Sequence, residues 1–209
     1  MRIAMQSAAS FIVVTAMLLA ANFASAQQPP EQVVQSATQG IIDELKRLPV
    51  EDRTEEQVRH LVMTYITPAI DQQRIAMGAL GKHWRRADNQ QRERFIELFR
   101  DLQIRTYAGA FKSFSGEQIT LAQTRFNQRG DRALVKGQLV QSNGQNIPLD
   151  FRLYQTRDNQ WRVYDAVVAG LSMVKTYRSQ LSEQLQSMSM DELLAQMEQQ
   201  APSAQQAQR

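Results

Sequence analysis

The sequence predicts an α+β fold, in which helices wrap a roll-like sheet of four strands that are antiparallel or mixed. The apolar pattern divides the chain into three stretches, and their order leads to this prediction. Apolar residues recur every three or four positions up to Phe114, alternate with polar ones from Ile119 to Val167, and return to helical spacing after Gly170. A curved sheet covered by helices leaves a concave interior. The pattern alone leaves open whether this interior is a packed core or a ligand cavity.

The N-terminus has the three parts of a secretory signal peptide. Arg2 precedes an apolar stretch, Phe11–Ala21, and the small-x-small sequence Ala24-Ser25-Ala26 follows. The apolar stretch is shorter than the roughly 20 residues of a bilayer-spanning helix, which favours cleavage over an uncleaved anchor. Gln27 stands where a lipoprotein would carry Cys. We therefore expect residues 1–26 to be removed and the remaining chain to be exported.

The composition excludes several classes of protein. The chain contains no Cys, which rules out disulfides, thiol nucleophiles and thiolate metal sites. Its formal net charge is only +3, with acids and bases interleaved, whereas nucleic-acid binders concentrate bases on one face. We therefore expect no nucleic-acid partner, and a single domain over residues 27–200 that rests on its hydrophobic core. The Gln- and Ala-rich end, residues 201–209, is expected to be disordered.

Four helices are expected before the sheet. Their apolar stripes fall within residues 34–48, 58–65, 75–84 and 95–114. Pro49 and Pro68 end the first two helices. The second, third and fourth helices have Thr54, Asp71 and Asp88 as their N-cap residues. The first and last of these caps are followed three residues later by Gln, which is the spacing of a capping box.

Four strands follow, joined by tight turns. The strands are expected near residues 119–121, 134–140, 147–153 and 161–167. Gly130 and the pair Asn143-Gly144 mark two of the turns, because Asn and Gly accept positive φ, and Asp158-Asn159 marks the third. Pro148 lies within the third strand, so part of this strand is expected at a sheet edge or a bulge.

Two helices are expected after the sheet. The first follows Gly170, and its apolar face contains Leu171, Val174 and Leu181. Ser172 is placed to cap this helix. The second is short and begins at Ser189, where a Glu three residues later completes a capping box.

The sequence offers little catalytic chemistry. His60 and His83 have neither the partners of a triad nor the spacing of metal ligands, so structural or surface roles are expected. Gly170-Leu171-Ser172-Met173 resembles the start of a nucleophile elbow, but Val174 replaces its closing Gly. The sequence also lacks a glycine-rich phosphate loop. It therefore predicts neither a metal site nor a bound cofactor.

Two stretches of the chain resemble a known family. They are Pro68–Arg74, continuing through Gly81–Ala87, Gln91–Phe95, Phe99-Arg100 and Tyr107, and Trp161–Asp165 followed by Gly170–Val174 and Tyr177-Arg178. Behind an export signal, these motifs are similar to the MlaC, or toluene-tolerance, family of periplasmic phospholipid-binding proteins. The resemblance extends over most of the mature chain, from about Val33 to Met197. It implies an α+β roll whose apolar cavity, between helices and sheet, holds lipid tails.

The resemblance also implies a function. The protein would be a periplasmic phospholipid carrier without enzymatic activity, and its only bound group would be the lipid cargo. Its partners would be an inner-membrane ABC transporter complex and an outer-membrane lipoprotein–porin complex. Its role would be to maintain the lipid asymmetry of the outer membrane.

The cavity is expected to have a stiff sheet wall and an adaptable helical wall. Candidates for the sheet wall are Leu139, Leu149, Phe151, Leu153, Trp161, Val163 and Val167. Candidates for the helical wall are Tyr107, Phe111, Met173, Val174 and Tyr177. The methionine suits chains of varied shape because its side chain is flexible. For each of these residues, a place in the packed core is the alternative.

Basic residues cluster where the longest helix begins. They are Lys82, Arg85, Arg86, Arg92 and Arg94, opposed between positions 82 and 94 only by Asp88 and Glu93. We call this group the basic rim. We expect it to steer the protein to acidic partner surfaces, or to screen a phosphate at the cavity mouth. A solvated helix entry is the alternative.

Two other classes of function stay open. Asp150, Asp158 and Asp165 lie on or near strands, and a converging pair of carboxylates could perform acid–base catalysis on a roll-like fold. Strand-face or turn roles are the more ordinary interpretation of these residues. The third class is a periplasmic adaptor or chaperone that binds peptides.

Overall fold

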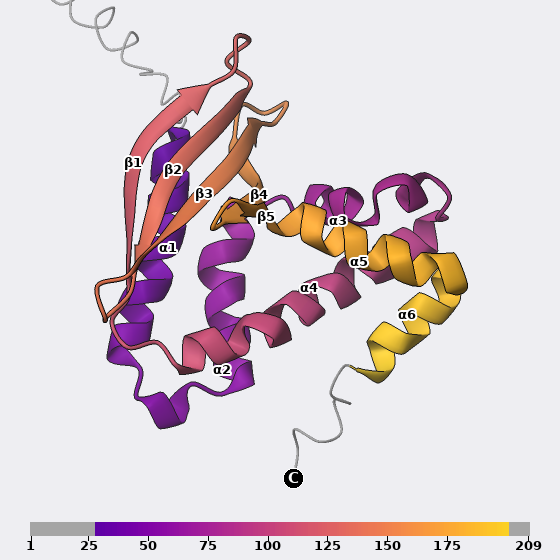
Figure 1. The fold of residues 1–209 in the computed structure, drawn as a ribbon, viewed down its shortest axis with the longest axis horizontal. Coiled ribbons are helices and arrows are strands. Elements are labelled where there is room, and N and C mark those ends of the chain that lie inside the picture. The colour runs from indigo at the N-terminus through magenta and orange to yellow at the C-terminus, as the bar shows by residue number, and fades with distance from the viewer. Residues whose placement is uncertain (1–27, 201–209) are drawn as a thin grey trace, which may run out of the picture.

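Helices form the first part and the end of the chain, and strands lie between them, which confirms the α+β prediction (Figure 1). The computed structural model describes residues 28–200, so the expected signal peptide and C-terminal tail lie outside the described residues. The first helical elements are α1 (Pro30–Arg47), η1 (Val50–Asp52), α2 (Glu55–Leu61), η2 (Val62–Ile66), η3 (Thr67–Ala69), α3 (Gln72–Leu80), η4 (Gly81–Arg85) and α4 (Asn89–Lys112). The strands are β1 (Gln118–Phe126), β2 (Arg132–Val140), β3 (Asn146–Gln155), β4 (Trp161–Val168) and β5 (Leu171–Ser172). The last helices are α5 (Met173–Ser187) and α6 (Met190–Gln199).

The helices begin where local hydrogen bonds predict. The N-caps of α2, α3, α4, α5 and α6 are Thr54, Asp71, Asp88, Ser172 and Ser189. Each cap side chain accepts a hydrogen bond from the backbone N–H three residues further on, which stabilises a helix by about 1 kcal/mol. The capping boxes at Asp88 and Ser189 are complete, whereas Thr54 has only the first of the two bonds.

The sheet is antiparallel with strand order β1-β2-β3-β4-β5, so it has one strand more than expected. The extra strand, β5, has two residues and pairs Ser172 with Val167. The chain reverses after β4 because Ala169 and Gly170 take positive φ angles of 49° and 83°. Leu171 was expected on the apolar face of α5. It lies instead in β5, and its side chain is 68% exposed.

Pro148 lies in β3 beside the end of β4, so this part of the strand has no ladder partner on one side, as at a sheet edge. The ladder between β3 and β4 starts one residue later, at the pair Leu149 and Val168. The Pro148 carbonyl accepts a hydrogen bond from the Ala169 N–H at 2.8 Å. The N and C=O of one residue point to the same neighbour in an antiparallel strand. The Pro148 nitrogen therefore faces the loop after β4, where the ladder needs no donor.

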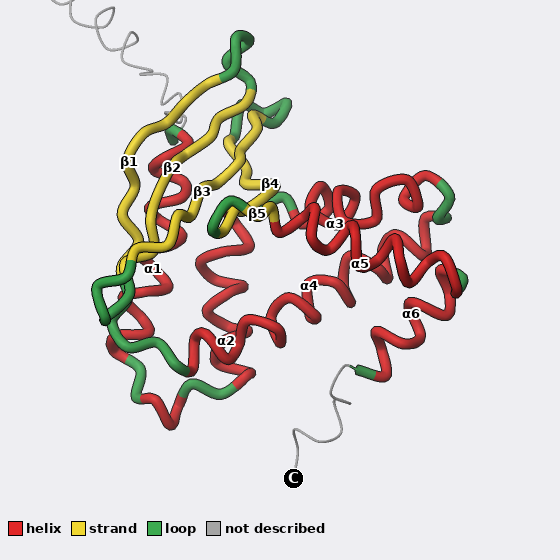
Figure 2. Tube along the Cα trace, in the orientation of Figure 1, coloured by secondary structure: helices red, strands yellow, loops and turns green. Residues whose placement is uncertain are grey.

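The helices pack in two groups (Figures 1 and 2). Helix α1 lies along one face of the sheet, and α3, α4, α5 and α6 form a group beyond β4. Apolar side chains of α1 pack on the sheet in one cluster, which contains Val33, Val34, Ala37, Ala69, Ala133, Val135, Leu153, Trp161 and Val163. A second cluster within the helical group is centred on Phe95 and Phe99, whose rings stack 5.2 Å apart. The sheet face that packs on α1 is called the inner face below.

A buried arginine joins the ends of two helices. Arg53 is 7% exposed, and its guanidinium donates to the carbonyls of Leu45 and Leu48 near the end of α1. It also donates to the carbonyls of Lys112 and Phe114 at the end of α4. The last carbonyls of a helix carry partial negative charge and lack partners within the helix. One cation therefore stabilises both helix ends and closes this side of the fold.

Candidate ligand-binding site

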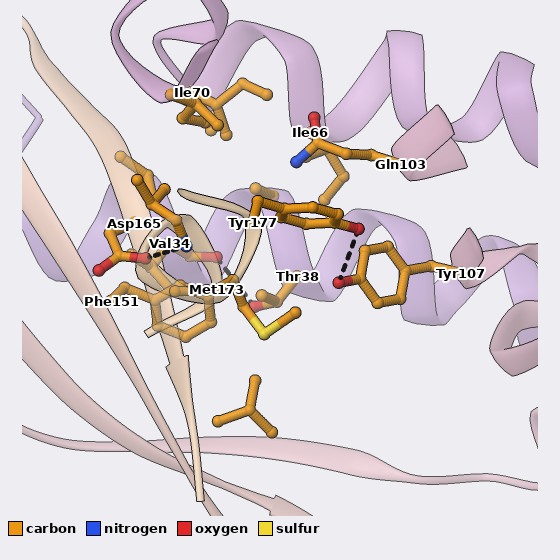
Figure 3. Close-up of a pocket in the computed structure, with 17 residues that line it drawn as sticks. Val34, Thr38, Ile66, Ile70, Gln103, Tyr107, Phe151, Asp165, Met173 and Tyr177 are labelled. Carbon is orange, nitrogen blue, oxygen red and sulfur yellow. Dashed lines mark hydrogen bonds between the residues drawn. The ribbon is translucent and has the colours of Figure 1, made fainter. Parts of the chain in front are cut away.

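An apolar chamber of about 300 Å³ lies between α1, the helical group and the inner face of β3 and β4 (Figure 3). It is lined by Val34, Ala37, Thr38, Ile66, Ala69, Ile70, Ile75, Gln103, Tyr107, Phe151, Val163, Asp165, Ala166, Val168, Met173, Val174 and Tyr177. Of these side chains only Asp165 carries a formal charge. The chamber is therefore suited to an apolar ligand or to the apolar part of a larger one.

A second hollow adjoins the chamber and is more polar. This outer groove, of about 560 Å³, is lined by Leu102, Thr106, Tyr107, Met173, Thr176, Tyr177, Gln180, Leu181, Glu183, Gln184 and Gln200. It lies between α4, α5 and the end of α6. Tyr107, Met173 and Tyr177 line both the chamber and the groove. The chamber is therefore in contact with a groove whose lining mixes apolar and polar side chains.

The sheet wall of the chamber depends on a β-bulge in β4. Leu153 pairs with Val163 and Phe151 pairs with Ala166, so β4 has one residue more than β3 between these pairs. Directly paired residues of an antiparallel sheet point to the same face. Val163 and Ala166 therefore both face the chamber. Val167 points to the opposite face, so its expected position in the cavity wall is wrong.

Six of the expected wall residues line the chamber. They are Tyr107, Phe151, Val163, Met173, Val174 and Tyr177. Leu153 and Trp161 belong to the packed core against α1, and Phe111 packs on Val58 and its neighbours in α2 and α4. Leu139 and Leu149 lie half-buried near the hairpin between β2 and β3 and do not line the chamber.

Helix α1 and the turn η2–η3 contribute a part of the chamber wall that was not predicted from the sequence. Val34, Ala37 and Ala69 come from these elements, and Ala166 from β4. Three of these four are alanines at positions that face inward. Protein interiors are otherwise closely packed, so small inward side chains leave volume that a ligand can fill. This is the signal that the sequence carried for the chamber.

Asp165 has a structural role at the chamber wall. Its carboxylate is 5% exposed and accepts hydrogen bonds from the Arg152 guanidinium at 2.8 Å and the Ser172 hydroxyl at 2.6 Å. It also accepts from the Val174 N–H at 3.1 Å. These three bonds join β3, β4 and the start of α5. Asp165 therefore holds the first turn of the helix that forms one wall of the chamber.

The other two aspartates of the possible catalytic set also have local roles. Asp150 accepts a long hydrogen bond, 3.4 Å, from the Gly137 N–H of the neighbouring strand. Asp158 is exposed in the turn between β3 and β4. With the Asp165 carboxylate occupied by three donors, the arrangement gives no support to acid–base catalysis by this set.

Two tyrosines meet at the boundary between chamber and groove. The Tyr177 hydroxyl donates to the Tyr107 hydroxyl at 3.4 Å, and the Tyr177 ring stands edge-on to Phe99 (Figure 3). Burial, and secondly this hydrogen bond, raise the pKa of the Tyr107 hydroxyl above its usual value. Tyr107 therefore keeps its proton well beyond neutral pH and can act as a hydrogen-bond donor.

The basic rim does not border either hollow. None of its five residues lines the chamber or the outer groove, so screening a phosphate at the cavity mouth is not supported. Lys82, Arg85 and Arg86 are exposed at the turn between α3 and α4. Arg92 donates to the Trp84 carbonyl at 3.0 Å and lies over its ring, and Arg94 is paired with a glutamate of α6, Glu198.

Within residues 28–200, no group of three or more His, Asp or Glu side chains is placed to hold a metal ion. None of the helices in this same range combines the length and the apolar character that crossing a membrane requires.

An apolar chamber between helices and a sheet, with a polar groove beside it, defines a protein that binds an apolar or amphipathic ligand. The family model described as MlaC protein matches residues 35–199. The chain belongs to the MlaC family, which confirms the resemblance found in its sequence.

Relatives agree with this assignment. The toluene tolerance protein ttg2D of Pseudomonas putida is 25% identical over 163 residues, which cover 77% of this chain and 75% of that protein. The intermembrane phospholipid transport system binding protein MlaC of Haemophilus influenzae is 26% identical over 148 residues, covering 69% of this chain and 68% of the relative. A phospholipid-binding protein from Ralstonia solanacearum, solved in complex with a phospholipid, has the same fold. Its TM-score is 0.77 at 24% identity, and the match covers 87% of this chain and all of that one.

Proposed function

We propose that this protein is a phospholipid carrier that holds the acyl chains of its cargo in the apolar chamber. The chamber is the observation that supports this function most directly, because all but one of the side chains that line it are uncharged. The relatives support it as well, since one belongs to a phospholipid transport system and another is a structure in complex with a phospholipid. The lipid is moved without a chemical step, so the function needs neither catalytic residues nor a cofactor.

The same proposal includes where the carrier acts and with which partners. The N-terminal signal would export it to the periplasm, where it would exchange lipid with an inner-membrane ABC transporter complex and an outer-membrane lipoprotein–porin complex. The name of the Haemophilus relative, which describes transport between membranes, supports this arrangement. Continuous exchange of this kind would maintain the lipid asymmetry of the outer membrane.

The energetics of the cargo determine how it is released. Two acyl chains contain about 30 methylenes, and exposing each to water costs about 0.8 kcal/mol, or roughly 24 kcal/mol in total. This exceeds the practical ceiling of non-covalent binding, about 18 to 21 kcal/mol. Release into water is therefore negligible. Lipid must pass directly from the chamber into a docked partner or a membrane.

Lipid extraction tests the proposed function. Purified mature protein is expected to carry diacyl phospholipid in near-stoichiometric amount, measured by organic extraction with lipid mass spectrometry and by native mass spectrometry of the intact complex. An exported protein of similar size without an apolar chamber, purified in parallel, serves as the control. Protein that is consistently empty, and that takes up no lipid from vesicles, would contradict the proposal. Binding of a peptide that added phospholipid fails to displace would favour the adaptor or chaperone instead.

The exposed part of the basic rim is expected to steer the carrier to its partners. Charge reversal in Lys82→Glu/Arg85→Glu should slow association with the inner-membrane complex about tenfold at low salt, because steering typically raises on-rates 10-fold or more. The difference should shrink above 0.1 M salt, where the Debye length falls below about 10 Å. Bound lipid should stay in place. Surface plasmon resonance at several salt concentrations gives these rates.

The control for this experiment reverses two exposed lysines away from the rim, in Lys46→Glu/Lys112→Glu, at the end of α1 and at the opposite end of α4. Arg92 is left unchanged because its guanidinium is bonded to the Trp84 carbonyl. Equal association rates for the rim variant and wild type at low salt would assign the rim to a solvated helix entry.

A further inference from the structure

The boundary between chamber and groove is formed by three side chains, Tyr107, Met173 and Tyr177, which line both hollows. A diacyl phospholipid is larger than the drug-sized ligands that occupy pockets of about 300 to 1,000 Å³. The chamber, at about 300 Å³, is too small to hold such a lipid entirely. Apolar parts of the acyl chains then occupy the chamber, whose wall is the more apolar of the two, and the rest of the lipid extends past these three residues into the groove.

Most polar groups of the chamber wall already have partners; apart from the tyrosine pair, only the Gln103 amide NH2 has none among residues 28–200. The Thr38 hydroxyl donates to the Val34 carbonyl at 2.9 Å. The Gln103 amide oxygen accepts from the Gln72 amide at 3.1 Å. The Asp165 carboxylate accepts the three hydrogen bonds described above. These groups therefore have little left to offer a ligand.

The tyrosine pair has one hydrogen left over. Two hydroxyls carry two hydrogens, and the single bond between Tyr107 and Tyr177 uses one of them, whichever residue donates. Among residues 28–200, neither hydroxyl has another hydrogen-bond partner. Both side chains are half-buried, and a buried donor without an acceptor is costly. The free O–H thus lies at the boundary, where water, or a bound ligand that displaces water, can accept its hydrogen bond.

We propose that the free O–H of the Tyr107–Tyr177 pair donates a hydrogen bond to an ester carbonyl of the bound lipid. The inference rests on the proposed function. In a lipid with its chains in the chamber and its polar part in the groove, the ester groups lie where the two compartments meet. A carbonyl oxygen is a strong acceptor that can only accept, which matches a leftover donor. The pair therefore selects ester-linked lipids over ether-linked lipids, whose chains attach without a carbonyl.

The raised pKa of Tyr107 is consistent with this role. A hydroxyl that keeps its proton across the physiological range remains a donor, so the preference for ester-linked lipid should not change between about pH 5 and pH 9.

The test compares a diacyl with a dialkyl phosphatidylcholine of equal chain length in a competition assay with delipidated full-length mature protein. Wild-type protein is expected to prefer the diacyl lipid about two- to tenfold, the range for one hydrogen bond. The single variants Tyr107→Phe and Tyr177→Phe each keep one hydroxyl and should retain a preference. The double variant should bind both lipids equally. The double variant Tyr65→Phe/Tyr164→Phe, whose residues line neither hollow, serves as the matched control.

The outcomes separate this inference from the proposed function. If wild-type protein binds neither lipid, the carrier function itself fails. If it binds both equally, the ester assignment is overturned. This comparison uses wild-type protein alone, so it does not depend on whether a variant folds. If the tyrosine double variant lost affinity for both lipids equally, the hydroxyl would donate to the phosphate that both lipids share, and the ester assignment would be overturned. If the preference for the diacyl lipid persisted in that variant, other groups of the protein would recognise the ester, and the assignment to the tyrosine pair would be wrong.

Discussion

Replacing Ala166 with tryptophan is expected to weaken phospholipid binding about tenfold while the protein stays folded. Ala166 faces the chamber because the bulge in β4 brings it to the same face as Val163. An indole at this position occupies space that would otherwise hold several methylenes of the cargo. Each methylene kept in water costs about 0.8 kcal/mol, so excluding only two weakens binding by about a factor of ten. Ala166→Leu, with a smaller side chain, should give an intermediate loss.

This experiment is measured by lipid extraction and by uptake of a fluorescent phospholipid from vesicles. The control is Ala110→Trp, which adds the same side chain at an exposed position of α4 away from both hollows. Circular dichroism and thermal unfolding establish whether each variant is folded. If a folded Ala166→Trp protein competes with vesicles and with wild-type protein for phospholipid as well as wild type does, the cargo does not occupy the chamber.

The second large effect is expected on stability. Asp165→Asn should lower the free energy of unfolding by about 2 to 3 kcal/mol, measured by urea unfolding at neutral pH. The carboxylate is buried, and its loss leaves the Arg152 guanidinium, the Ser172 hydroxyl and the Val174 N–H with a weaker, uncharged partner. Breaking a fully buried ion pair costs about 3 to 5 kcal/mol, and the estimate is reduced because the Arg152 side chain is 36% exposed.

Asp158→Asn is the control for this prediction, since Asp158 is exposed in a turn and should change stability by less than about 0.5 kcal/mol. Lipid uptake by the folded Asp165→Asn protein distinguishes a role of Asp165 in stability from a direct role in lipid binding. If the variant kept wild-type stability but lost function, Asp165 would act on the ligand, and the structural role assigned here would be wrong.

The sequence predicted the features that depend on neighbours along the chain. An N-cap such as Asp71 or Ser172 bonds a backbone group three residues away, so its pattern is visible locally. The turn at Gly144, with a φ of 84°, is equally local. The same reasoning succeeded for the alternation of β3, where Phe151 faces the chamber.

Features that depend on distant residues could not be read from the sequence. Strict alternation assigned Val167 to the cavity wall because a bulge appears only when β4 pairs with β3. Pro148 indicated an edge or a bulge, but only the pairing of β3 with β4 shows that β4 ends beside it. The sequence pattern gave no sign of the role of Arg53. Its burial follows only from the meeting of two helix ends that lie far apart in the chain.

The walls of the chamber come from distant parts of the chain, and this affects how the chain folds. Val34 in α1 and Val163 in β4 both line the chamber, yet they lie far apart in the chain. Contacts between such distant residues form late and slow the folding of a domain. A growing or newly translocated chain must therefore keep the apolar face of α1 uncovered until the strands are complete, a period in which it is prone to aggregate. Ligand binding becomes possible only when α5 closes the last wall, so the chain cannot acquire cargo before it has folded.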